Sequence, residues 1–113
     1  MTMNPFDDRE KAFEAKFQFD EELAFKVNAR RDMLIGRWVA VHIGLTGEDA
    51  ESYARSVVVA DLEDSQHKAM LRKLINDLKI ARAKVGEKEL HAELDRLSAV
   101  ARRQIATEAD AAK

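Results

Sequence analysis

The sequence predicts an all-α protein, a small four-helix bundle that follows a mobile amphipathic arm at the amino terminus. Only one proline and four glycines occur among the 113 residues, and 35% of the residues are charged. This composition is rich in helix formers and poor in strand and turn residues. Apolar residues also recur at helical spacing in separate segments of the chain. We expect the arm to cover residues 1–18, the bundle residues 19–107, and a carboxyl-terminal tail residues 108–113.

The first helix of the predicted bundle ends at Gly44, because glycine is favoured just after a helix end. Its apolar side chains fall on one face of a helix with about 3.6 residues per turn. These side chains are Phe19, Leu23, Val27, Leu34, Trp38 and Val41. We expect Trp38 to anchor the core, and Gly36 to let a neighbouring helix approach closely.

Three further helices follow from capping residues and apolar stripes. Thr46 and Asp49 form a predicted capping box for the second helix, and Asp64 or Ser65 is a candidate cap for the third. Gly86 is predicted to end the third helix, and the fourth then starts with an acidic first turn. The predicted inner residues are Ala50, Tyr53, Ala54, Val57 and Val58, then Met70, Leu71, Leu74, Ile75 and Leu78, then Leu90, Leu94, Leu97, Ala101 and Ile105. Because the turns are short, we expect neighbouring helices to pack antiparallel.

Several function classes are disfavoured by composition. The chain has no cysteine, which excludes disulfides, thiol catalysis and cysteine-based metal sites. Its net charge of −2 argues against nucleic-acid binding. No apolar stretch approaches the roughly 20 residues of a membrane span, and no signal peptide is visible. The three histidines are not spaced as metal ligands. We therefore expect no catalytic residues, no metal and no cofactor.

The amino-terminal segment differs from the bundle in the direction of its apolar edge. Asn4 and Pro5 form a helix-start signal. Phe6, Phe13 and Phe17 would lie within about 40° of one another on a helix, roughly a quarter turn from the face of the first bundle helix. This narrow stripe offers little burial to offset backbone ordering, so we expect the segment to be frayed when free. It would fit a groove in a partner, although packing on its own domain explains the spacing equally well.

A basic pair offers an alternative site. Arg30 and Arg31, together with the basic face of the third helix, could attract a phosphate or a nucleotide weakly, but no glycine-rich phosphate loop accompanies them. The runner-up function is therefore a nucleotide- or anion-responsive helical regulatory protein.

The run from Phe6 to Glu14, followed by Lys16 and Phe17, resembles the opening motif of the zeta inhibitor subunits of alphaproteobacterial F-type ATP synthases. The resemblance continues through Gly36, Trp38 and Gly44 to Asp61, and is looser after Ser65. It implies a four-helix domain whose arm folds into a helix as it wedges into a catalytic interface between the alpha and beta subunits, beside gamma. The arm would then block rotation in the hydrolysis direction.

Carried onto this sequence, the resemblance implies a non-enzymatic inhibitor that binds through its arm. The arm residues expected to bind the partner are Asn4, Pro5, Phe6, Asp7, Asp8, Arg9, Glu10, Lys11, Phe13, Glu14, Lys16 and Phe17. Among them, Phe6 and Phe13 are the expected anchors. We expect the free protein to be a monomer, to be cytoplasmic, and to associate with the inner-membrane ATP synthase through its catalytic head.

Overall fold

The computed structural model describes residues 20–112. Within this range it contains four helices and no strand: α2 (Glu21–His42), α3 (Gly47–Leu62), α4 (Lys68–Ile80) and α5 (Glu87–Ala111). The predicted all-α class and the four bundle helices are confirmed. The arm predicted at residues 1–18 lies outside the described residues. Helix α5 continues through the segment predicted as a tail from residue 108 onward.

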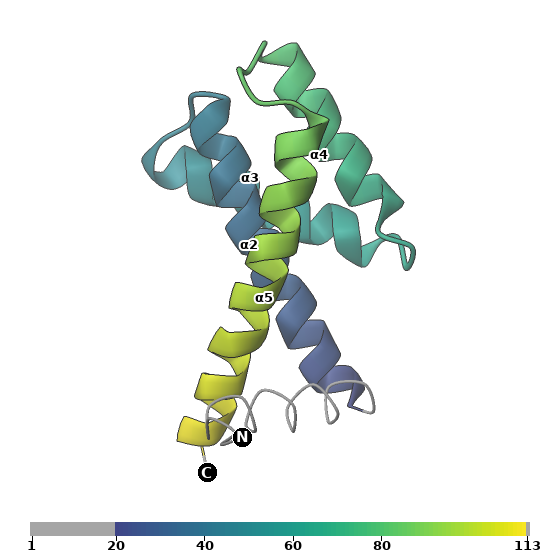
Figure 1. The fold of residues 1–113 in the computed structure, drawn as a ribbon, viewed down its shortest axis with the longest axis vertical. Helices are drawn as coiled ribbons and strands as arrows, with labels where there is room; N and C mark the ends of the chain where they lie inside the picture. The colour runs from purple at the N-terminus through teal and green to yellow at the C-terminus, as the bar shows by residue number, and fades with distance from the viewer. Residues whose placement is uncertain (1–19, 113) are drawn as a thin grey trace, which may run out of the picture.

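Helix α2 lies at the centre of the domain. It packs along α3 on one side and along α5 on another, and it also touches α4. In Figure 1, α2 and α5 cross, and their amino- and carboxyl-terminal ends, respectively, lie at the lower end of the view. The main core contains fully buried side chains from all four helices, among them Ile35, Val57, Leu74 and Leu90. None of the four helices is long and apolar enough to cross a membrane.

Helix α2 buries two different faces along its length. Near its start, Leu23 and Val27 pack with Ala101 and Ile105 of α5. Toward its end, the buried side is the one carrying Val39 and Ala40, which on a regular helix points well away from Val27. The single apolar stripe predicted for this helix is therefore correct for Leu23 and Val27, which are buried, and for Leu34 and Trp38, which pack against the core, but not for the end of the helix.

Val41 is the residue for which the predicted stripe is wrong. Its side chain is 70% exposed, because the last turns of α2 present another face to the core. Trp38, by contrast, packs against the core and meets the ring of His42 edge-on, with 4.4 Å between the ring centroids. The predicted structural role of Trp38 is thus confirmed.

Of the helix caps predicted for α3 and α4, the first makes no capping hydrogen bond and the second does. Thr46 is the N-cap residue of α3, but its side chain makes no capping hydrogen bond, so the predicted capping box is wrong. Asp64 does cap α4. Its carboxylate accepts hydrogen bonds from the backbone N–H of Gln66 at 3.0 Å and of Ala69 at 2.9 Å.

Helix α4 ends at Ile80, several residues before Gly86, so the predicted end of this helix at Gly86 is wrong. Arg82 follows in a left-handed conformation, with a φ of 52°, which turns the chain away from the helix axis. Because of this turn, α5 makes its extensive contacts with α2 and not with α4. The close antiparallel pairing expected between the last two helices is therefore wrong.

Candidate functional site

Twelve predicted site residues lie in the arm, outside the described residues: Asn4, Pro5, Phe6, Asp7, Asp8, Arg9, Glu10, Lys11, Phe13, Glu14, Lys16 and Phe17. The structure describes the part of the domain to which this segment is joined. That part consists of Asp20 and the first turns of α2, which pack against the last turns of α5.

Asp20 fixes the start of α2. Its carboxylate accepts hydrogen bonds from the backbone N–H of Glu22 at 3.0 Å and of Leu23 at 3.2 Å, and its own backbone is extended. Glu21 and Glu22 occupy the first turn, where the positive end of the helix dipole favours carboxylates. The helix therefore has a well-defined first turn immediately after the arm.

The beginning of α2 is tied to the end of α5 by both apolar and charged contacts. Arg30 donates to the two carboxylate oxygens of Glu108, at 2.6 and 2.7 Å, and to the side-chain oxygen of Gln104 at 2.9 Å. The hydrogen bonds from Arg30 lower the pKa of the exposed Glu108 carboxyl, and the same contact raises the pKa of Arg30. Such a two-pronged pair fixes the relative position of the two helices as well as their distance.

A shallow, mainly apolar groove runs between these two helix ends. Its lining includes Leu23, Phe25, Met33, Ile105 and Ala109. Phe25 is 54% exposed, although Leu23 and Val27 on either side of it in α2 are buried. The surface between the start of α2 and the end of α5 therefore combines these apolar side chains with the charged residues Lys26, Arg30 and Glu108.

Arg31 points to a different part of the domain. Its guanidinium lies 3.0 Å from Asp32 and 3.0 Å from Asp61 of α3, and its side chain is only 15% exposed. Asp61 also accepts a hydrogen bond from Nδ1 of His67 in the α3–α4 connection. These four residues, Arg31, Asp32, Asp61 and His67, are called the Asp32–Asp61 cluster below.

The two carboxyl groups of the cluster are shifted in opposite directions. Burial, followed by the hydrogen bond to Asp61, raises the pKa of Asp32 to about 8. Burial would raise the pKa of Asp61 as well, but the hydrogen bonds from Asp32 and His67 and the charge of Arg31 outweigh it and lower that pKa. The pair therefore retains one proton at neutral pH, on the Asp32 side.

The predicted anion site at Arg30 and Arg31 is not a single pocket. The two side chains leave α2 in different directions, as neighbouring helical residues do, and each is paired with carboxylates of the domain. A phosphate would have to displace Glu108 from Arg30 or Asp61 from Arg31. The anion or nucleotide site stays a prediction, and this pairing does not favour it.

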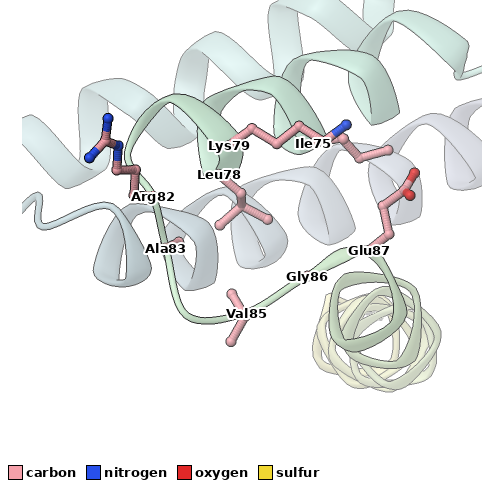
Figure 2. A pocket seen from close by; sticks show the side chains of 8 residues that line it. All are labelled: Ile75, Leu78, Lys79, Arg82, Ala83, Val85, Gly86 and Glu87. Atoms are coloured by element: carbon pink, nitrogen blue, oxygen red, sulfur yellow. The ribbon is translucent and has the colours of Figure 1, made fainter.

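The basic face of α4 borders a second hollow, between the end of α4 and the start of α5. Figure 2 shows that Lys79 extends toward the side on which Glu87 lies, whereas Arg82 points away from the loop that carries Val85. The cationic groups do not converge on one point, and a carboxylate lies among them. The geometry is unlike a phosphate cradle, in which several donors aim at the same ligand.

No group of three metal-ligating side chains is found within residues 20–112.

The Asp32–Asp61 cluster was not predicted from the sequence, although one signal was available. Asp32 lies on the same side of α2 as Ile35 and Val39, so an aspartate occupies a position on the buried face. Its carboxyl group is 2% exposed, which a lone charged carboxylate would not tolerate.

The fold and the surface around Asp20 define a small all-helical protein in which Arg30, Arg31 and Arg37 of α2 are paired with carboxylates of other helices. The sequence model of the ATPase inhibitor subunit zeta family matches residues 3–104 of this chain. The chain therefore belongs to that family of ATP synthase inhibitors, and it is a regulatory protein and not an enzyme. No curated protein matches the sequence.

Proposed function

We propose that this protein inhibits ATP hydrolysis by inserting residues 1–18 into a catalytic interface between the alpha and beta subunits of ATP synthase, next to gamma. The folded domain then holds the arm in place, so that rotation in the hydrolysis direction is blocked. The observation that carries the proposal is the extent of the family match, which begins at residue 3 and thus includes the arm together with the domain.

The domain has the properties that such a mechanism requires of its base. A segment that stops a rotary motor must be attached to something that does not unfold when the segment is pushed. The arm joins α2 at Asp20, and α2 packs against each of the other helices. The pair between Arg30 and Glu108 braces the same end of α2 against α5. Force on the arm would therefore reach the centre of the core.

Aromatic residues are distributed in a way that supports a binding role for the arm. Three of the five phenylalanines in the chain, Phe6, Phe13 and Phe17, lie in the arm. The core of residues 20–112 is built instead from aliphatic side chains and contains no buried phenylalanine. Clustered aromatic side chains are typical anchors when a helix binds in a groove.

The location follows from the same proposal. An inhibitor of the catalytic head would act where that head is exposed, on the cytoplasmic side of the inner membrane. We propose the same location for this chain.

The proposal is tested by removing residues 1–16 and measuring inhibition of ATP hydrolysis by the isolated catalytic head. We expect the shortened chain to retain its helical circular dichroism signal and its cooperative melting, and to lose inhibition. The matched control is Lys79→Gln, which alters the basic face of α4 in the runner-up anion site and leaves both the arm and the pair between Arg30 and Glu108 intact. Retained inhibition by the shortened chain, or loss of inhibition in the control alone, would contradict the proposal.

A further inference from the structure

The Asp32–Asp61 cluster joins three parts of the fold that are separate along the chain. Arg31 and Asp32 belong to α2, Asp61 to the last turn of α3, and His67 to the connection that leads into α4. Both carboxyl groups are buried, with 2% exposure for Asp32 and 7% for Asp61. The cluster therefore holds the corner between α3 and α4 against the middle of α2.

The backbone at this corner is held in an unfavourable conformation. His67 has a φ of 62°, in the left-handed region that residues with a side chain rarely adopt. The backbone N–H of His67 donates to the carbonyl of Asp64 at 3.1 Å, and its imidazole Nδ1 donates to Asp61. These bonds offset the cost of the conformation, and the bond to Asp61 depends on the state of the cluster.

The number of protons in the cluster is limited by its composition. One guanidinium can neutralise only one buried carboxylate, and the hydrogen bond between Asp32 and Asp61 requires a proton on one of them. Loss of that proton would place two carboxylates side by side with a single cation between them. Two buried like charges in contact are strongly unfavourable.

We propose that the Asp32–Asp61 cluster is a pH-sensitive latch, closed while the carboxyl pair holds one proton and opened at alkaline pH when that proton is lost. Opening releases the corner between α3 and α4 from α2. The charged groups that face the pair are Arg31 from α2 and His67 from the α3–α4 connection. The latch does not depend on the proposed mechanism of inhibition, since it lies in the described domain and not in the arm.

The direction of the pH dependence follows from the shift at Asp32. A carboxyl group whose pKa is raised in the folded state stabilises the fold fully below its ordinary pKa, and the stabilisation is lost as the pH rises through the folded value. For Asp32 this window extends from its ordinary value of 3.8 to about 8. The asparagine variant carries a neutral amide of the same shape and has no proton to lose.

The test compares thermal melting of the full-length protein, Asp32→Asn and Asp95→Asn, an exposed control on α5, from about pH 6 to about pH 9. We expect the melting temperature of the wild type and of the control to fall by at least about 5 °C over this range. We expect that of Asp32→Asn to change much less. Equal slopes in all three proteins would overturn the latch.

A second measurement decides the question if the asparagine variant does not fold. The side-chain carboxyl carbon of Asp32 can be followed by ¹³C NMR in the wild-type protein as the pH is raised. The latch predicts a titration midpoint far above the ordinary aspartate value of 3.8, accompanied by chemical-shift changes at His67 and Ala69. A midpoint near the ordinary value would overturn the proposal.

Discussion

The Cα atom of Ala54 in α3 lies 2.7 Å from the position that a Cβ atom would occupy on Gly36 of α2, and its Cβ lies 3.1 Å from that position. The absence of a side chain at Gly36 therefore sets the distance between the two helices. The close approach predicted for Gly36 is confirmed. Close packing of α2 against α3 offsets the lower helix propensity of a mid-helix glycine, which costs about 0.5–1 kcal/mol.

Replacing Gly36 with alanine should destabilise the protein by about 1–3 kcal/mol, because the new methyl group would force α2 and α3 apart. The better helix propensity of alanine offsets only part of this cost. The free energy of unfolding in urea measures the effect. Gly86→Ala is the control, since its new Cβ would meet only the flexible tip of Glu89 at 3.4 Å. Equal stability of Gly36→Ala and the wild type would show that the helices can move apart at no cost.

Tyr53 should resist ionisation well above the ordinary tyrosine pKa of about 10. Burial, together with the hydrogen bond that its hydroxyl donates to Asp77 at 2.7 Å, raises the pKa of Tyr53. It is the only tyrosine in the chain, so the ultraviolet absorbance of the phenolate reports on this residue alone. We expect no phenolate signal until the protein unfolds at high pH.

Asp77→Asn provides the comparison for this titration. Burial is the larger cause of the shift, so we expect the tyrosine pKa to fall in the variant and still to exceed its ordinary value. A phenolate that appears at the ordinary pH while the helical signal is intact would contradict the burial of Tyr53.

The pair between Arg30 and Glu108 should hold the end of α5 without contributing much to global stability. Glu108 is exposed, and exposed ion pairs are screened by water and salt. We expect Glu108→Gln to speed hydrogen exchange in the turns of α5 after Ala101 and to leave the melting temperature almost unchanged. Because the pKa of Glu108 is lowered, the protection should be present above the ordinary glutamate pKa and fade as the pH falls through the folded value.

Glu93→Gln is the matched control for this change. Glu93 pairs with Arg96 on the same helix, so its loss removes an ion pair from α5 and leaves the contact with α2 intact. If both variants speed exchange at the end of α5 equally, the contact with Arg30 is not the cause.

Local signals in the sequence predicted most of the fold, and the errors fall where packing between helices decides. Gly44 marks the end of α2 and Gly86 the start of α5 through their own backbone or capping chemistry, as predicted, whereas α4 ends well before Gly86. Val41 was misassigned because α2 changes its buried face midway, where it leaves α5 and meets α3. Periodicity along one chain cannot indicate which neighbour each turn will meet.

Charged residues were harder to interpret than apolar ones for the same reason. Arg30 and Arg31 are adjacent in the sequence, which suggested one basic site. Their partners come from distant parts of the chain: Arg30 pairs with Glu108 of α5, and Arg31 pairs with Asp61 of α3. The two arginines therefore belong to two different ion-pair sites. The sequence shows the charges, whereas only the fold shows which of them are already paired.

Replacement of Phe13 separates binding by the arm from packing of the domain. Phe13→Ala should leave the melting temperature almost unchanged and weaken inhibition of ATP hydrolysis by at least about tenfold, as expected for an aromatic anchor in an interface. Phe25→Ala is the matched control, because Phe25 is an exposed phenylalanine of the folded domain. Both variants lose the same atoms, so a difference in inhibition reports on position alone. A large loss of stability in Phe13→Ala would mean that this side chain belongs to the core of its own domain, and the proposed insertion into ATP synthase would then lose its main anchor.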